Sequence, residues 1–378
     1  MKFVIAPDSY KESVSAFEAS VAMKEGIQKV FKEAEYELIP MADGGEGTTE
    51  VLVYSLKGEF RKVRVTSPLG EKIEAKYGFY PEWKKAIIEV ASACGLNLVE
   101  TSKRNPLYTT TYGVGEMILD ALDNGAENFI IGLGGSSTND GGLGMLQALG
   151  AKAFDAHGNE VGFGGKELIK ITRIETFLID SRLKNAIIEV ACDVENPLVG
   201  DKGATRIFGP QKGATTIIVE ELEKGMKNYA EVLSKEFKID IAHTPKAGAA
   251  GGLGGAFILL GANLTNGIQL VLKHTGFERK IIDADYIFTG EGSIDSQTKY
   301  GKTLSGIAVI AKKHKVPIIA LAGMVGDDIE ELYDMGITSI FGIVDRPKEL
   351  KQSLEDGYNS IKKTSENIAR LLEKCKNK

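Results

Sequence analysis

The chain of 378 residues has few of the side chains on which small secreted proteins and zinc proteins depend. It contains three cysteines, an odd number scattered along the sequence, and four histidines. Three cysteines cannot form a disulfide framework, and without a CxxC, an HExxH or a Cys/His cluster no zinc site is expected. So few cysteines are typical of a protein from a reducing compartment, and we expect a cytoplasmic location.

An excess of positive charge is missing as well. Lysine and arginine number 46 against 52 acidic residues, which gives a formal net charge of −6. A general nucleic-acid binder needs basic residues to neutralise phosphates, so nucleic acid is not an expected partner. The longest apolar run, 247–262, is too short for a membrane span and largely glycine and alanine, so a membrane segment is not expected either. We do not expect the N-terminal MKFVIAPDSYKES to be a signal peptide.

Several familiar catalytic signatures are also absent. APDSYK stands where a GxGxxG would follow the first predicted strand, which weakens a dinucleotide-binding interpretation. SQTKYGKT at 296–303 is a near miss for a P-loop, because Ser296 occupies the place of the first glycine. The protein-kinase catalytic signature and the GxSxG of α/β-hydrolases are missing too.

Apolar runs alternate with helical patterns at both ends of the chain. MKFVIAPD begins with a short buried strand, Ser15 and Glu18 form a capping box for the next helix, and 35–40 is a second strand. The same rhythm returns late, with strands at 283–292, 316–323 and 337–344 and helices near 303–314 and 328–335. This alternation predicts a parallel, doubly wound sheet.

The middle of the chain has a different pattern. The segment 63–80 alternates apolar and polar residues after a Pro-Leu-Gly turn, which predicts an antiparallel hairpin. The pentapeptide IIEVA occurs at 87–91 and again at 187–191, and a further apolar run lies at 128–135. We interpret all three as buried strands, and a true internal duplication has no support from the flanking residues.

These patterns predict an α/β fold with two domains. The length of the chain agrees with this, because a domain with a single hydrophobic core is usually shorter. Residues 1–60 and 280–378 would form one α/β domain from both ends of the chain. Residues 61–279 would form an inserted mixed α/β domain. The C-terminal stretch 348–374 reads as a surface-packed helix without a chemical role.

Two glycine-rich segments have the composition of loops that approach a ligand. GLGGSSTNDGG at 132–142 lies between a predicted strand and a predicted helix. Backbone N–H groups and the helix N-terminus could bind an anion there, while Asn139 and Asp140 could orient a hydroxyl or hydrated Mg²⁺. A tight turn with an Asx cap is the alternative. PKAGAAGGLGGAF at 245–257 has the same form, with close packing of small residues as its alternative.

Carboxylates follow several of the predicted strands, as Asp8, Asp43, Asp193, Glu291 and Asp295 do. Ligands of open α/β sheets bind outside the carboxyl ends of the strands, although each acid could instead be a helix cap or turn former. Glycine loops combined with acids suit phosphoryl transfer, which needs backbone donors, carboxylates for a metal and a base for the attacking hydroxyl. Two lysines, Lys11 and Lys302, could neutralise negative charge.

A set of ordered motifs identifies a resemblance. The motifs are APDSYKES, ADGGEGT, RNPLYTTTYGVGE, GLGGSSTNDGG, ACDVENPL, FGPQKGA, AGAAGGLGG and TGEGSIDSQTKYGK. In this order, over nearly the whole chain, they resemble the class I glycerate kinases of bacteria. The resemblance implies ATP-dependent phosphorylation of D-glycerate at the 2-hydroxyl with Mg²⁺, in a cleft between two α/β domains, one of them flavodoxin-like. Ser293, Leu304 and Tyr10 depart from the common pattern, where arginine, proline and phenylalanine are usual.

Chemistry then assigns roles to the motif residues. Asp193 or Asp295 would take the proton from the glycerate hydroxyl, and the other would hold Mg²⁺ with Glu291. The further catalytic candidates are Lys11 and Asp43. Residues expected to bind substrate are Asp8, Arg104, Asn139, Asp140, Asn196 and Lys302. Residues expected to cradle the nucleotide phosphates are Gly134, Gly135, Ser136, Ser137, Gly251, Gly252 and Gly254.

Two other functions remain open on the sequence alone. A nicotinamide-dependent hydroxy-acid dehydrogenase would use the same kind of sheet, although the missing GxGxxG counts against it. A non-catalytic sensor of a sugar acid would need polar donors but no cluster of acids. The sequence leaves open whether the 2- or the 3-hydroxyl is phosphorylated, whether related hydroxy acids are accepted, and which homo-oligomer, if any, forms.

Overall fold

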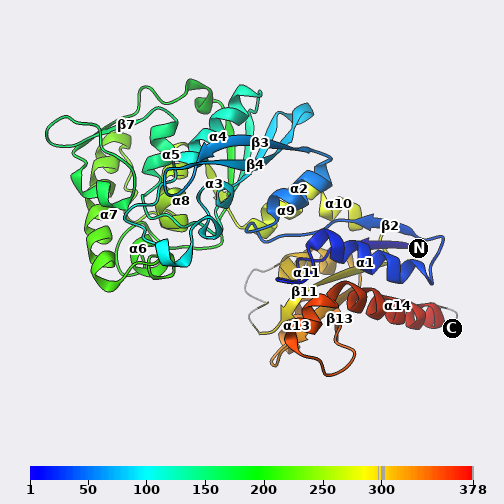
Figure 1. Cartoon of the computed structure of the whole chain (residues 1–378). Coiled ribbons are helices and arrows are strands. Elements are labelled where there is room, and N and C mark those ends of the chain that lie inside the picture. Colours follow the sequence, from blue (N-terminus) through cyan, green and yellow to red (C-terminus); the bar gives the residue numbers. More distant parts are fainter. Residues whose placement is uncertain (297, 299–302, 377–378) are drawn as a thin grey trace. The chain divides into compact units, whose positions relative to one another are not determined.

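The computed structural model describes residues 1–296, 298 and 303–376, and the predicted substrate residue Lys302 lies outside them (Figure 1). The chain forms two compact units. The first comprises Met1–Asp43, Glu50–Leu56 and Ile268–Lys378, and the second comprises Gly44–Thr49 and Lys57–Gly267. Across the part of the chain described, no helix has the length and apolar character needed to cross a membrane.

The first unit contains a five-stranded parallel sheet with the strand order β13-β12-β11-β1-β2. Its strands are β1 (Lys2–Ile5), β2 (Glu35–Leu38), β11 (Tyr286–Ile294), β12 (Ile318–Val325) and β13 (Ile337–Gly342). Counted within the unit, this is the flavodoxin-like order 2-1-3-4-5. The predicted doubly wound sheet built from both chain ends is confirmed.

Helices pack around this sheet. They are α1 (Ala16–Gln28), most of α2 (Thr48–Leu56), α9 (Gly267–Thr275), α10 (Phe277–Ile281), α11 (Thr303–His314), α12 (Glu330–Met335), α13 (Leu350–Glu355) and α14 (Gly357–Lys376). The predicted capping box of Ser15 and Glu18 begins α1. Helix α9 packs on α11, where a Cβ on Gly306 would lie 2.7 Å from the Ile268 side chain. The second junction therefore lies at Gly267 and not near residue 280.

The second unit contains a six-stranded mixed sheet with the order β10-β9-β6-β5-β4-β3. Its strands are β3 (Glu59–Thr66), β4 (Lys72–Tyr80), β5 (Lys85–Glu89), β6 (Asn128–Gly132), β9 (Ile187–Ala191) and β10 (Asn263–Thr265). The predicted hairpin is the antiparallel pair β3–β4, and β5, β6, β9 and β10 run parallel. The second IIEVA copy is the whole of β9, whereas the first ends β5 at Glu89 and continues through Val90 to Ala91 at the start of α3, and the two strands lie on either side of β6. Two short strands, β7 (Lys152–Phe154) and β8 (Arg173–Glu175), form a separate pair.

The helices of the second unit surround a core of fully buried side chains that includes Tyr77, Phe129 and Phe257. They are α3 (Ala91–Cys94), α4 (Tyr112–Asp123), α5 (Leu143–Ala148), α6 (Ala204–Phe208), α7 (Thr216–Phe237) and α8 (Leu253–Leu259). Helix α8 is buried on nearly all sides, as expected for the apolar run after the second glycine segment.

The sheets place the predicted acids at strand ends, with one difference. Asp8 follows β1, Asp43 follows β2 and Asp193 follows β9. Glu291, in contrast, lies within β11, because this strand continues along β12 as far as the pair Ile294–Val325. The expectation that Glu291 lies beyond its strand is wrong, and Asp295 is the acid that directly follows β11.

Candidate active site

In the first unit, Asp8 lies at the point where the strand order reverses between β1 and β11. The Ser9 N–H donates to its Oδ1 at 2.6 Å, and the Thr303 hydroxyl at the start of α11 donates to its Oδ2. Burial raises the pKa of Asp8 in spite of these bonds, and the charge of Asp43 raises it further. Ligands of doubly wound sheets bind at such a reversal, so Asp8 and Asp43 occupy the expected place.

Tyr10 links a further acid to this position. Its hydroxyl donates to the Leu321 carbonyl at 2.8 Å, and the side chain is buried. Burial raises the pKa of Tyr10, and the charges of Glu291 and Asp8 add to the effect. Asp8 and Glu291 therefore both lie near Tyr10, one of the residues that departs from the common family pattern, and Asp43 lies near Asp8.

The segment after β11 is held by Thr298. The Asp295 N–H donates to the Thr298 hydroxyl at 3.1 Å, and the Thr298 N–H donates to the Asp295 carbonyl at 3.0 Å. The Thr298 hydroxyl also lies 3.5 Å from Glu291 Oε1, which is the limit of a hydrogen bond. The Lys11 side chain is exposed, and its backbone lies beside Gly292. Most of the predicted acids are therefore carried by one edge of this sheet.

In the second unit, the loop 132–142 is organised by Asp140, which is fully buried. Its carboxylate accepts hydrogen bonds from Thr111 N and Oγ1, both at 2.8 Å, and from Gly142 N at 3.2 Å and Gly144 N at 3.3 Å. These amides lie at the start of α5, which has only six residues. The expected anion site at this helix N-terminus does not form, because Asp140 itself caps the helix.

The exposed part of the loop is Gly134 and Gly135. Within the described residues, no hydrogen bond from the N–H group of either glycine is found. The Ser137 N–H and hydroxyl, in contrast, both donate to the Cys94 carbonyl, at 2.8 and 2.9 Å. Gly134 and Gly135 are therefore placed to approach a ligand, whereas Ser137 anchors the loop to α3.

Beneath the loop lies Lys212, a residue that the sequence analysis did not select. Its ammonium group donates to Ser136 Oγ at 2.9 Å and to the Thr138 carbonyl at 2.6 Å, and the residue is only 2% exposed. Burial lowers the pKa of Lys212 to about 8. The only signal in the sequence was its place in the motif FGPQKGA, where a lysine would normally be assigned to the surface.

The second glycine segment packs against the first. A Cβ on Gly251 would lie 2.0 Å from the Thr138 carbonyl, and one on Gly252 would lie 2.5 Å from Gly141 Cα. Both glycines are buried and have positive φ, and Gly254 is held in the same way by the Lys246 carbonyl. The alternative interpretation of close packing therefore describes Gly251, Gly252 and Gly254 better than direct phosphate contact does.

Asp193 follows β9 at the same sheet edge as the loop after β6. The Asn266 side-chain amide donates to its Oδ1 at 2.6 Å, and the Gly267 N–H donates to the same oxygen at 2.9 Å. Asp193 is exposed, so its carboxylate is both oriented and accessible. Glu89 ends β5 at this edge and accepts a hydrogen bond from Thr49 N at 2.7 Å, although the sequence identified it only as part of a strand.

Three other predicted substrate residues make contacts within the second unit. The Arg104 guanidinium donates to the carbonyls of Val99 and Leu96, both at 3.3 Å. The side-chain amide of Asn139 donates to Thr205 Oγ1 at 2.9 Å. The side-chain amide of Asn196 donates to the Lys202 carbonyl at 2.8 Å. Asn139 is fully buried, while Arg104 and Asn196 are half-buried.

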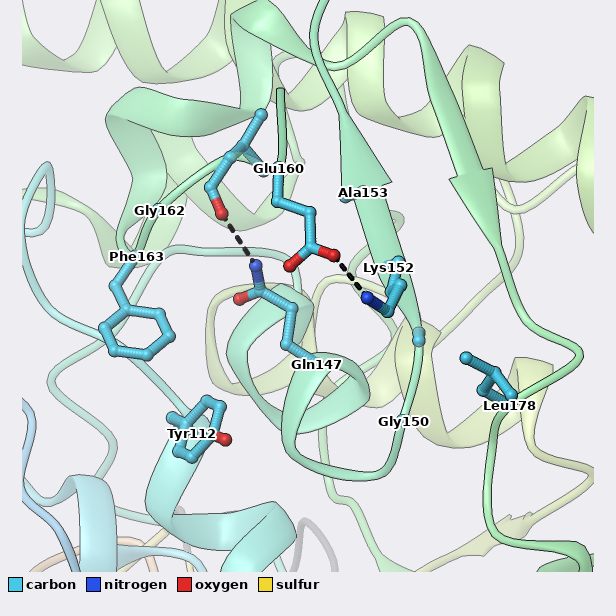
Figure 2. A pocket seen from close by; sticks show the side chains of 11 residues that line it. Tyr112, Gln147, Gly150, Lys152, Ala153, Glu160, Gly162, Phe163 and Leu178 are labelled. Atoms are coloured by element: carbon cyan, nitrogen blue, oxygen red, sulfur yellow. Dashed lines mark hydrogen bonds and ion pairs between the residues drawn. The ribbon is translucent and has the colours of Figure 1, made fainter. Parts of the chain in front are cut away.

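A separate cavity of about 480 Å³ lies beside α5 (Figure 2). It is lined by Tyr112, Gln147, Gly150, Ala151, Lys152, Ala153, Glu160, Val161, Gly162, Phe163 and Leu178. The rings of Tyr112 and Phe163 lie 4.9 Å apart at one side, and Lys152 and Glu160 form an ion pair of 2.5 Å at the other. None of these lining residues is a predicted site residue, so we assign no part of the reaction to this cavity.

Comparison with known proteins gives consistent matches over the full length. The model of the glycerate kinase family matches residues 3–373. The glycerate 2-kinase of Escherichia coli (strain K12) is 49% identical over 373 residues, which cover 98% of each chain. The glycerate kinase of Halalkalibacterium halodurans is 47% identical over 367 residues, or 97% of each chain. The crystal structure of a candidate glycerate kinase 2 from Salmonella typhimurium LT2 matches with a TM-score of 0.92 and 42% identity, covering both chains completely.

Proposed function

The chain belongs to the glycerate kinase family, and from this premise we propose that it transfers the terminal phosphoryl group of ATP to the 2-hydroxyl of D-glycerate. The observation that carries the proposal is the 49% identity with a glycerate 2-kinase over 98% of both chains. The resemblance seen in the motifs is confirmed, and the chain is a kinase with a small-molecule substrate. Neither a nicotinamide-dependent dehydrogenase nor a non-catalytic sensor is supported.

Asp193 is the residue that we assign as general base. A hydroxyl is a poor nucleophile near pH 7, so a carboxylate must accept its proton as the new oxygen–phosphorus bond forms and ADP leaves. The hydrogen bonds from Asn266 and Gly267 hold one oxygen of Asp193 in a fixed direction, and the side chain is exposed. These contacts support Asp193 over Asp295, which lies in the same segment as Glu291.

Mg²⁺ suits the carboxylates of the first unit. Magnesium binds to proteins through one or two carboxylates and takes its other ligands from phosphates and water. Burial is the main cause of the raised pKa of Asp8, and the nearby charge of Asp43 adds to it, so a second carboxylate lies close by. We assign Glu291 and Asp295 to the metal, which would neutralise charge on the nucleotide phosphates.

The remaining assignments follow from exposure. Gly134 and Gly135 would donate backbone N–H groups to phosphate oxygens, and Lys11 would add positive charge from the first unit. Asp140, Ser137 and the glycines of 251–254 would position the loop and not contact the ligand. Asp8 and Asp43 would bind hydroxyl groups, and the half-buried Arg104 guanidinium is the candidate for the glycerate carboxylate.

A coupled assay tests this function. The purified protein with Mg-ATP should release ADP when D-glycerate is added and should not do so without it. Asp193→Asn should lower kcat by roughly 10²- to 10⁴-fold, because the base is lost while the hydrogen-bonding shape is kept. Circular dichroism should show an unchanged fold. Near-normal turnover of the Asp193→Asn variant would refute the assignment of the base.

Location and assembly stay predictions. The scarcity of cysteine favours a cytoplasmic location, and a homo-oligomer remains an expectation. Size-exclusion chromatography with light scattering would determine the assembly state directly.

A further inference from the structure

We propose that Lys212 is a buried positioning cation that gives the Gly134–Ser136 turn its affinity for the phosphate chain of the nucleotide. The inference rests on the proposed function, since it takes ATP as the ligand. It goes beyond that function because the charge is supplied from beneath the loop, by a residue that does not touch the ligand. The residue acts through Ser136 and through its electric field.

The contacts of Lys212 tie it to the loop. Its ammonium group donates to Ser136 Oγ at 2.9 Å and to the Thr138 carbonyl at 2.6 Å. Because Ser136 Oγ accepts from the ammonium, the Ser136 hydroxyl hydrogen must point to a different acceptor. The next residues along the loop are the exposed Gly135 and Gly134, whose N–H groups form no hydrogen bond to another described residue.

The ammonium group of Lys212 makes no direct ion pair with a described residue, although the charge of the nearby buried Asp140 offsets part of the effect of burial on its pKa. Over the described part of the chain, no ion pair to its ammonium group is found. Lys348 shows the contrast: its side chain is 5% exposed, and it pairs with Asp345 at 3.1 Å and Asp356 at 2.9 Å. Burying an unpaired ammonium group costs free energy, whereas a bound anion would offset that cost.

The helix N-terminus cannot supply this charge. The amides of Gly142 and Gly144 at the start of α5 are taken by the Asp140 carboxylate, and α5 is only six residues long. Asp140 would even repel a phosphate placed nearby. Lys212 is therefore the group in this loop region whose positive charge favours binding of a polyanion. Because Lys212 lies under Ser136, this charge attracts the phosphates to the exposed turn.

Two titratable groups, Cys94 and Asp140, act on the pKa of Lys212, and the backbone of Arg104 lies next to it. Burial raises the pKa of the Cys94 thiol to about 12, so Cys94 stays neutral near pH 8. The buried Asp140 carboxylate has a raised pKa, and Arg104 packs its backbone carbonyl against Gly213, next to Lys212. With its pKa lowered to about 8, Lys212 is the group among these that loses its proton between pH 7 and pH 9.

Calorimetric titration of the full chain with Mg-ATP, without glycerate, tests the proposal. Wild type should bind ATP roughly tenfold more weakly at pH 9 than at pH 7.5, because the ammonium group loses its proton. Lys212→Met should bind about 10- to 100-fold more weakly than wild type at pH 7.5, with this pH dependence gone. Lys212→Arg keeps its charge at all these pH values, so it should retain part of the affinity and also lose the pH dependence.

Lys348→Met is the control, because it removes a lysine ammonium group whose side chain is also largely covered but which is paired with two carboxylates. It should leave the affinity for ATP and its pH dependence as in wild type. Wild-type affinity in Lys212→Met, or an unchanged decline toward pH 9 in Lys212→Met or Lys212→Arg, would overturn the proposal. If Lys212→Met does not fold, the pH profile of Lys212→Arg decides.

The outcomes also separate this inference from the proposed function. Binding of ATP is measured without the acceptor, so the predicted differences can hold even if D-glycerate is not phosphorylated, and only the function would then fail. If D-glycerate is phosphorylated while Lys212→Met binds ATP normally, only the inference fails. If the wild type does not bind ATP, both fail.

Discussion

At the scale of single residues, the two units use buried charge in opposite ways. Asp8 is a carboxyl group in a buried place near other acids, and Lys212 is a buried ammonium group that makes no direct ion pair among the described residues. Both arrangements disfavour the charged form in the absence of a ligand. Such costs are typical of functional sites, where stability is lost in exchange for binding or catalysis.

Asp8→Asn should make the protein more stable at pH 7. The pKa of Asp8 is raised in the folded state, so the folded protein binds this proton more tightly than the unfolded chain does. Stability from this group therefore falls as the pH rises above the unfolded pKa, and the amide removes that loss. Urea unfolding should show a higher midpoint for the variant at pH 7 and a smaller gain at pH 4.

The control for Asp8→Asn is Asp283→Asn. Asp283 is paired with Lys2, and this pairing lowers its pKa, so the variant should have no gain in stability at pH 7. A midpoint of Asp8→Asn below that of wild type at pH 7 would mean that the contacts with Ser9 and Thr303 outweigh the cost of burial.

Sequence reasoning placed residues such as Asp8 and Asp193 correctly after their strands, because a short apolar run followed by an acid marks a strand end. Glu291 was described as following its strand although the predicted strand, 283–292, already included it, and pairing with β12 extends β11 still further, to Ile294. Lys212 was missed, because its burial depends on packing under a loop that lies more than 70 residues earlier in the chain.

At the scale of elements, backbone packing between the two glycine segments shapes the loop. The Gly141 N–H donates to the Gly251 carbonyl at 3.0 Å, so the two backbones are in direct contact. Glycine is required there because a side chain would collide with the facing backbone. Composition could not distinguish this packing from ligand binding, since both need glycine.

Gly251→Ala should therefore be much more harmful than Gly261→Ala. Both glycines have positive φ, +70° and +81°, but a Cβ on Gly261 meets nothing within 4 Å whereas one on Gly251 collides with the Thr138 carbonyl. We expect a loss of about 1 kcal/mol for Gly261→Ala, from φ alone, and about 3 kcal/mol or more for Gly251→Ala.

Chemical denaturation of both variants measures these losses, and ATP titration shows whether the loop is damaged. Equal losses of stability in the two variants would show that the loop adjusts to an added methyl group, contrary to the packing described here.

At the scale of the whole molecule, the chain inserts one α/β unit between β2 and β11 of another. The interruption was visible in the sequence, because the strand–helix rhythm stops after residue 40 and resumes near residue 283. The junction at Gly267 was not visible in the sequence, since α9 has the same amphipathic pattern as any surface helix. Only the packing of α9 on α11 assigns it to the first unit.

The central claim is that this kinase phosphorylates D-glycerate at the 2-hydroxyl. Phosphorus NMR of a reaction with D-glycerate and Mg-ATP tests it most directly, because the coupling of the phosphorus to protons differs between the two products. A phosphate on a secondary carbon couples to a single proton, whereas a phosphate on a primary carbon couples to two. We predict a doublet that matches authentic 2-phosphoglycerate and grows together with ADP. A triplet from 3-phosphoglycerate, or ADP formation without any new phosphate ester, would contradict the account.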